Sequence, residues 1–410
     1  MTRSQPPRAR RRARYGPAAL TILALLCAGC LPGGAGDREA PANSAAPAPP
    51  RASAPSQGAC DDCLDVVVTG DLLVHPQLWD QAAADAAVTG RTPLDFEPLL
   101  AGQRPYLAAA DLAVCHLETP VADPEGPYTG YPTFNVPPQI LTAAKEVGYD
   151  ACTSASNHTL DAGPAGVLRT LAALDAAGLE HTGSYASAAD AEQPLLLDTP
   201  DAKVALIEAT YALNGQTPDE PWRVDLLDVP AMIAKARTAR EQGADVVLAA
   251  LHAGDEYASV PNAQQTEVAH ALADSGLVDF IYGHHTHSVL PIEKYNGTWI
   301  AYGLGNAVTE LSPVYDVNNE GLAVRARFSR DEAGQWAVSD LAWLPSVIVS
   351  NPYRWCALGP DRPAGSCSTP GHEQAVKDRT RSVVESLGAA TAGAHPWDLE
   401  ADEKRAPADP

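Results

Sequence analysis

The sequence predicts an α/β fold in which helices cover both faces of the sheets. Six short apolar runs are continuous rather than alternating, which is typical of strands buried on both faces. Helical patterns lie between several of these runs, and strand–helix alternation favours sheets covered by helices. Polar residues also cluster directly after five of the strands. Because ligands bind at the carboxyl ends of strands in α/β sheets, these clusters predict the place of a site.

The predicted elements follow in chain order. The strands cover residues 64–70, 111–117, 149–155, 203–210, 244–251 and 278–283. The helices cover residues 163–178, 229–243 and 262–276. From Val289 onward the pattern changes to strands with few helices, and Asn296-Gly297 between two apolar runs predicts a hairpin turn.

The amino-terminal residues carry the features of an export signal. Six arginines and no acidic residue precede an apolar stretch of about 15 residues, too short for a membrane-spanning helix of about 20 residues. Residues 1–29 are therefore predicted to be a signal peptide. The ending "LLCAGC" resembles a lipobox with Cys30 as the lipidated residue, although Cys27 is unusual at its position. We expect anchoring to the outer face of the cell membrane, or secretion if Cys30 is not lipidated.

Two segments are predicted to lie outside the folded domain. Residues 30–59 are rich in Pro, Ala, Ser and Gly without apolar periodicity, which is typical of a disordered tether. A flexible chain of about 28 residues spans roughly 30 Å. Residues 389–410 are predicted to be a disordered tail, which leaves residues 60–388 as the folded domain.

The charge of the chain excludes one class of partner. The formal net charge is −23, and loss of the leader with its six arginines takes it to about −29. Such an acidic protein repels nucleic acid and anionic lipid, so no nucleic-acid partner is expected.

Six of the eight cysteines remain after cleavage behind Cys27 and lipidation of Cys30. Export to an oxidising compartment permits disulfide bonds between them. Cys356 and Cys367 flank a Pro/Gly-rich loop and are the favoured pair. The C-x-x-C at residues 60–63 favours a local bridge over a zinc or redox role, because no second C-x-x-C accompanies it. Cys115 and Cys152 lie near the ends of two predicted strands and can pair if those strands are neighbours.

The clusters after the strands contain carboxylates, an amide and several imidazoles. They are Asp71 to His75, His116 to Thr119, Asn157 to Asp161, His252 to Tyr257 and His284 to His287. Each cluster alone is explained by a turn, a helix cap or a surface histidine, but their recurrence at one layer of the sheet favours a metal site. An extended backbone at His285-x-His287 would place both side chains on one side. Mixed oxygen and imidazole ligands suit zinc, manganese or iron, and two such ions need a bridging carboxylate.

The motifs "TGDLL", "HLETP", "FNVPP", "SNHTLDAG", "HAGDEY", "GHHTHSVLPIE" and "YGLGN" occur in the order and at the spacing of the CapA family. This family of poly-γ-glutamate capsule synthesis proteins is similar to the calcineurin-like metallophosphoesterases. The resemblance covers about residues 64 to 310. It implies a four-layer α/β/β/α sandwich with two divalent metal ions at one edge.

The resemblance also implies roles for individual residues. The implied metal ligands are Asp71 and His287 on one ion, Asn157, His252 and His285 on the other, and Glu118 between them. His158 would act as a general acid or stabilise charge on an oxygen, with Asp161 orienting it. His284 would support the ligands.

The chain departs from the pattern of the broader phosphoesterases at one ligand position. His75 stands four residues after Asp71 rather than two, which makes it a weaker ligand candidate. Glu256 and Tyr257 have either a role near the substrate or ordinary roles as a buried carboxylate and a packing aromatic.

The leading hypothesis is an exported, membrane-anchored hydrolase with two metal ions. Its substrate would be a phosphoester, or an amide bond of poly-γ-glutamate or another cell-envelope polymer, and its partners would include other capsule synthesis proteins. The main alternative is a non-catalytic envelope component that keeps the metal site for structure or polymer binding. A C-x-x-C redox protein is a third interpretation, which lacks a strand-then-helix context around residues 60–63.

Overall fold

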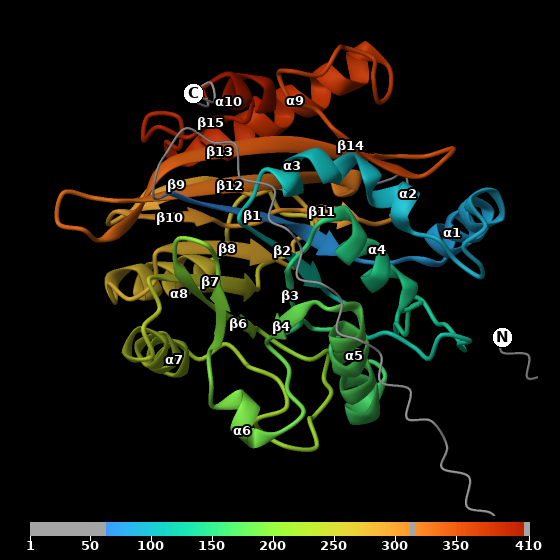
Figure 1. The fold of residues 1–410 in the computed structure, drawn as a ribbon, viewed down its shortest axis with the longest axis horizontal. Coiled ribbons are helices and arrows are strands. Elements are labelled where there is room, and N and C mark those ends of the chain that lie inside the picture. Colours follow the sequence, from blue (N-terminus) through green and yellow to red (C-terminus); the bar gives the residue numbers. More distant parts are fainter. Residues whose placement is uncertain (1–62, 312–316, 406–410) are drawn as a thin grey trace, which may run out of the picture. The chain divides into compact units, whose positions relative to one another are not determined.

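Two mixed β-sheets packed face to face form the centre of the fold (Figure 1). The computed structural model describes residues 63–311 and 317–405. Contacts divide the chain after residue 52, so all described residues belong to the second unit. The predicted signal peptide, Cys30 and the tether lie outside the described residues.

The first sheet has the strand order β14-β13-β12-β1-β2-β3-β4, with β11 beside β1 and β15 beside β13. Its strands are β1 (Cys63–Leu72), β2 (Leu112–Leu117), β3 (Ala151–Thr153), β4 (Glu180–Thr182), β11 (Asn306–Val308), β12 (Glu320–Arg330), β13 (Trp336–Val349), β14 (Arg354–Ala357) and β15 (His395–Pro396). Strands β1 to β4 are parallel, whereas β12, β13 and β14 are antiparallel to their neighbours in this order. The parallel strands therefore end together at one edge.

The second sheet has the order β5-β6-β7-β8-β10-β9. Its strands are β5 (Leu195–Asp198), β6 (Lys203–Thr210), β7 (Val246–His252), β8 (Phe280–His284), β9 (Ile292–Tyr295) and β10 (Thr298–Ala301). Strands β6, β7, β8 and β10 are parallel. The hairpin predicted at residues 296–297 is confirmed, since Asn296 and Gly297 have φ angles of 48° and 92° between β9 and β10.

Helices cover the outer faces of both sheets, which confirms the four-layer sandwich. In β1, Val66 and Val68 pack between the sheets, whereas Val67 packs against the outer helices, because successive side chains of a strand point to opposite faces. The helices on the first sheet are α1 (Pro76–Thr89), α2 (Glu97–Leu100), α3 (Arg104–Ala108), α4 (Gln139–Val147) and α5 (Gly163–Ala177). Those on the second sheet are α7 (Val229–Glu241) and α8 (Ala263–Asp274).

All six strands and three helices predicted from residues 64 to 283 are present, with ends shifted by a few residues. Helix α8 begins where its cap predicts, because Asn262 Oδ1 accepts from the Gln265 backbone N–H and Gln265 Oε1 accepts from the Asn262 N–H. Helices α1, α2 and α3 lie between β1 and β2, where no helix is predicted from the sequence.

The carboxyl-terminal region corrects the prediction of a disordered tail from residue 389. Helices α6 (Ala188–Ala191), α9 (Pro370–Val384) and α10 (Leu399–Arg405) complete the set of α-helices in the described ranges. Trp397 is fully buried against Tyr106, and its backbone N–H donates to Trp343 O of β13. The buried side chain of Trp397 thus holds the otherwise polar segment 389–405 against the first sheet.

In the described part of the chain, no helix has both the length and the apolar character needed to cross a bilayer.

The two disulfide predictions that the described residues can test are confirmed. Cys356 bonds to Cys367 across its loop, and Cys115 bonds to Cys152 because β2 and β3 are neighbours in register. The third bridge was predicted within residues 60–63, of which only Cys63 is described, and Cys63 is disulfide-bonded.

Candidate metal centre

The two sheets bring their polar strand ends to the same level. Asp71 pairs in register with His116 in the first sheet, and His252 pairs with His284 in the second. Contacts then join the sheets, since the His116 ring stacks on the His284 ring at 4.1 Å between centroids. Clusters separated by over 200 residues of sequence thus meet in one buried place.

The first donor group consists of Asp71, Glu118 and His287, all buried, with ligand atoms within 4.8 Å of one another. His287 Nδ1 lies 3.4 Å from Asp71 Oδ2, and His287 Nε2 lies 3.5 Å from Glu118 Oε1. Neither carboxylate oxygen of Glu118 has a hydrogen-bond partner among the described residues. A buried carboxylate without partners is costly, so a bound cation would satisfy this group.

The second donor group consists of Asn157, His252 and His285, which the sequence analysis assigned to one ion. Asn157 Oδ1 lies 2.8 Å from His252 Nε2, and the His252 and His285 rings are 4.9 Å apart. His285 Nδ1 is buried without a hydrogen-bond partner within the described residues. The fold therefore assembles all six predicted ligands, while their binding to metal stays a prediction.

The backbone at residues 285–287 differs from the extended form expected from the His-x-His spacing. His285 and His287 have φ angles of 86° and 49°, in the left-handed region. Non-glycine residues there are uncommon, and such strain gathers at functional sites. A turn after β8, rather than a continued strand, directs both side chains into the centre.

The predicted catalytic pair also forms. His158 Nδ1 lies 2.7 Å from Asp161 Oδ2, and the same oxygen accepts from the Phe134 backbone N–H at 2.8 Å. The Phe134 ring packs edge-on against His158. Asp161 thus holds the orientation of the imidazole, as predicted, with Nε2 left for chemistry.

The two buried carboxylates of the first donor group favour a positive charge beside them, as the pKa shifts of the group indicate. Burial raises the pKa of Asp71, but hydrogen bonds from His284 and His287 outweigh burial and hold that pKa well below its ordinary value. Burial raises the pKa of Glu118 to about 7. Burial lowers the pKa of His287, but the charges of Glu118 and Asp71 outweigh it and raise the pKa to about 10.

Two imidazoles of the second donor group, His285 and His252, are held neutral. Burial, followed by the charge of His287, lowers the pKa of His285 to about 3. Burial, followed by the charge of His116, lowers the pKa of His252 well below its ordinary value. Neutral imidazoles are the form that binds metals.

The remaining predicted site residues, His284, His75, Glu256 and Tyr257, lie at different places around the centre. His284 is buried and its Nδ1 lies 2.6 Å from Asp71 Oδ1, which fits a supporting role. His75 stands at the N-cap position of α1 without a side-chain cap bond, and the Glu310 backbone N–H donates to its Nδ1 at 3.3 Å. Glu256 is exposed, so its interpretation as a buried carboxylate is wrong. Tyr257 is 42% exposed and its ring centroid lies 6.2 Å from that of His287, so both interpretations of Tyr257 remain predictions.

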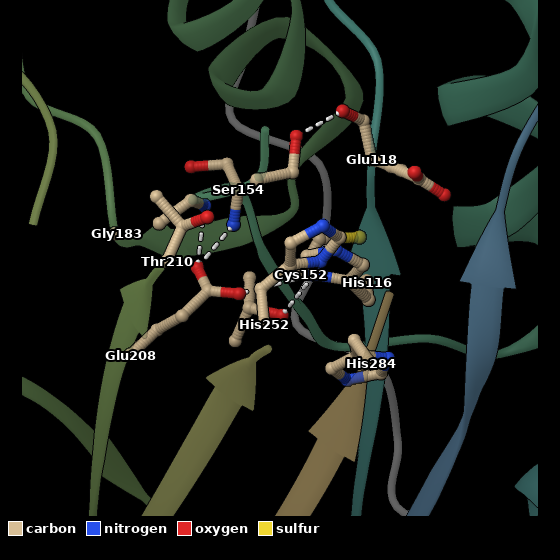
Figure 2. Close-up of polar contacts among 12 residues, drawn as sticks. His116, Glu118, Cys152, Ser154, Gly183, Glu208, Thr210, His252 and His284 are labelled. Atoms are coloured by element: carbon tan, nitrogen blue, oxygen red, sulfur yellow. Dashed lines mark hydrogen bonds and ion pairs between the residues drawn. The ribbon is translucent and has the colours of Figure 1, made fainter. Parts of the chain in front are cut away.

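His116 and Glu208 have no role predicted from the sequence. His116 Nε2 lies 2.9 Å from His252 Nδ1, and His116 Nδ1 lies 3.0 Å from Glu208 Oε1 (Figure 2). His116 also joins Asp71 and His284 in a second group able to hold a metal ion. The available signal for Glu208 is a single carboxylate inside the apolar run of residues 203–210.

The fold and the centre define an α/β sandwich protein with a cluster of buried oxygen and nitrogen ligands that fits divalent metal ions. The chain belongs to the family of the bacterial capsule synthesis protein PGA_cap, whose model matches residues 65–311.

Relatives of this family carry names connected with capsule polymers. The chain is 32% identical over 177 residues to the PGA biosynthesis protein CapA of Bacillus subtilis, covering 42% of this chain and 45% of CapA. It is 28% identical over 292 residues to a probable polyglutamine synthesis accessory protein of Mycobacterium tuberculosis, covering 61% of this chain and 75% of that protein. The match thus spans less than half of the CapA relative's length.

Among solved structures, the chain is similar to the calcineurin-like phosphoesterase YfkN from Bacillus subtilis. The two share 14% identity with a TM-score of 0.41, over 79% of this chain and 98% of that chain.

Proposed function

We propose that this protein is an exported, membrane-anchored hydrolase that uses two divalent metal ions and acts in capsule or cell-envelope polymer metabolism. The substrate would be a phosphoester, or an amide bond of poly-γ-glutamate or a related polymer. Manganese, zinc and iron each suit the mixture of carboxylate, amide and imidazole ligands.

The observation that carries this proposal is the state of Glu118. Its carboxylate is fully buried, no described residue donates a hydrogen bond to it, and Asp71 and His287 lie beside it. A fold gains no stability from such a group unless a cation shares it. Glu118 would bridge two ions, with Asp71 and His287 on one side and Asn157 and its neighbours on the other.

The protein residues would divide the chemical work between them. Divalent metal ions supply Lewis acidity and lower the pKa of a bound water. The ligands hold the reacting groups in place, and His158 Nε2 would deliver a proton to the leaving group or bind a developing negative charge. Asp161 Oδ2 keeps the proton of His158 on Nδ1 when the ring is neutral and stabilises the ring when both nitrogens are protonated.

The charges around the centre favour a short substrate or a polymer end over the middle of a free polyanion. Burial raises the pKa of Tyr211 above its ordinary value, and the negative charges of Glu256, Glu118 and Asp255 raise it further. Tyr211 packs on His285 at 4.5 Å between ring centroids. An acidic rim repels a long anionic chain unless the ions of the centre neutralise the bound part.

The test is hydrolysis of a chromogenic phosphodiester and of a γ-glutamyl oligomer, each with added Mn²⁺, by protein purified without chelator. His287→Ala and Asn157→Ala should each lose metal and reduce kcat/KM at least about 100-fold. His270→Ala is the matched control, because His270 contacts Glu293 and lies outside the donor groups. Metal binding without hydrolysis of either substrate would favour a non-catalytic, polymer-binding component. Unchanged metal content and activity in both site variants would refute the ligand assignment.

The membrane anchor is tested separately through Cys30. Cys30→Ser should move the protein from the membrane fraction to the soluble fraction, whereas Cys27→Ser, three residues earlier, should leave it in the membrane. Retention of the Cys30→Ser protein in membranes would contradict lipidation.

A further inference from the structure

We propose that Glu208 and His116 are positioning residues that set the tautomer of His252, so that His252 Nε2 is free to bind a metal ion. This inference rests on the proposed metal centre. It assigns a role to a carboxylate that touches none of the six proposed ligands and acts through two imidazoles in series.

Glu208 lies in a socket built from two backbone segments, residues 154–155 and Gly183. Its Oε2 accepts from the backbone N–H groups of Ser154 at 2.7 Å and Ala155 at 2.6 Å. At Gly183, whose φ is 104°, an added Cβ would lie 2.1 Å from the same oxygen. The carboxylate is fully buried, so its position and its role as an acceptor at Oε2 are determined by the backbone.

The second oxygen of Glu208 faces His116. His116 Nδ1 lies 3.0 Å from Glu208 Oε1 and 2.9 Å from Thr153 Oγ1. An ionised carboxylate can only accept, so the ring nitrogen 3.0 Å from it is the protonated nitrogen of the imidazole, and the Thr153 hydroxyl accepts from the same N–H. His116 Nε2 then carries the lone pair.

The tautomer of His116 determines that of its neighbour. His116 Nε2 lies 2.9 Å from His252 Nδ1, so a lone pair on His116 requires the proton on His252 Nδ1. His252 Nε2 is then unprotonated and lies 2.8 Å from Asn157 Oδ1. Two acceptor atoms at this distance repel each other, but a cation that binds both removes the repulsion. Figure 2 shows the side chains of Glu208, His116 and His252 gathered at the strand ends.

The opposite set of tautomers would satisfy the contacts among His116, His252 and Asn157 without metal. His252 Nε2–H would donate to Asn157 Oδ1, and His116 Nε2–H would donate to His252 Nδ1. His116 Nδ1 could then accept from the Thr153 hydroxyl, but its lone pair would also face the Glu208 carboxylate oxygen 3.0 Å away and be repelled by it. The rings cannot avoid the choice by turning, because His116 is fully buried and stacks on His284. The carboxylate of Glu208 therefore selects the metal-binding set.

The experiment is Glu208→Gln, which has nearly the same shape. The two backbone N–H groups require the glutamine oxygen at the Oε2 position, so the NH₂ group takes the Oε1 position and donates to His116 Nδ1. This reverses both tautomers and places a proton on His252 Nε2. We expect the affinity for Mn²⁺, measured by competition with a chromogenic chelator, to fall about 10- to 100-fold. The ¹⁵N NMR signals of His252 in metal-free variant protein should report a proton on Nε2.

Asp279→Asn is the matched control. Asp279 is a half-buried acceptor of a backbone N–H in the second sheet, but it directly precedes β8 beside Arg240, away from the carboxyl ends of the strands. This variant should keep wild-type Mn²⁺ affinity, and circular dichroism with urea unfolding establishes that both variants are folded. Wild-type affinity in folded Glu208→Gln, or an equal loss in Asp279→Asn, would overturn the positioning role alone. A wild-type protein that binds no divalent metal would overturn the proposed function together with this inference.

Discussion

Asp161→Asn should lower the pKa of His158 and shift the pH range in which His158 is protonated. Burial lowers the pKa of His158, but the hydrogen bond and charge of Asp161, together with the charge of Glu118, outweigh burial and raise it above its ordinary value. Asparagine keeps an oxygen for the bonds from His158 and from the Phe134 N–H, and it removes only the charge.

The magnitude follows from the type of bond that is lost. A hydrogen bond to a charged group contributes about 1.5–3 kcal/mol, against about 1 kcal/mol for a neutral bond. The difference of about 1–2 kcal/mol corresponds to roughly one pKa unit, at about 1.4 kcal/mol per unit. Because the folded-state pKa is raised, this pair stabilises the fold fully below about pH 6.5, and the stabilisation is lost as pH rises through the folded-state pKa.

The assay is an NMR titration of the His158 ring in wild-type and Asp161→Asn protein. The variant should titrate about one unit lower, and the alkaline limb of a pH–rate profile should shift by the same amount if His158 is the general acid. Asp255→Asn removes an exposed carboxylate that does not bond to His158, so it serves as the charge-matched control. An unchanged titration in Asp161→Asn, or an equal shift in the control, would refute this account of the pair.

Two further predictions concern stability. Replacing both Cys115 and Cys152 with Ala opens a loop of 37 residues and should cost about 4 kcal/mol, whereas opening the 11-residue loop between Cys356 and Cys367 should cost about 3 kcal/mol. Urea unfolding checks this order, and a larger loss at the shorter loop would contradict the loop-entropy argument. Trp397→Ala should cost about 3–5 kcal/mol, because a fully buried indole leaves a cavity. A loss below about 1 kcal/mol would show that the segment after residue 389 does not stabilise the first sheet.

The sequence predicts the central fold well because its signals are local. Continuous apolar runs such as residues 203–210 match their strands, and the Asn296-Gly297 turn needs only two adjacent residues with positive φ. The carboxyl-terminal segment was mispredicted because the burial of Trp397 depends on β13, a partner some 50 residues away. The polar composition of residues 389–405 does not indicate that contact.

The amino-acid sequence alone specifies the strands, the helices and the polar residues at the strand ends, because these depend on neighbours along the chain. Only the tertiary structure decides how the residues act together: the turn that directs His285 and His287 inward, the unpartnered carboxylate of Glu118, and the contact of Glu208 with His116. Hydrogen bonds and burial are properties of pairs of atoms in space. The pairs at this centre come from different strands in two sheets, so the fold must form before their chemistry is defined.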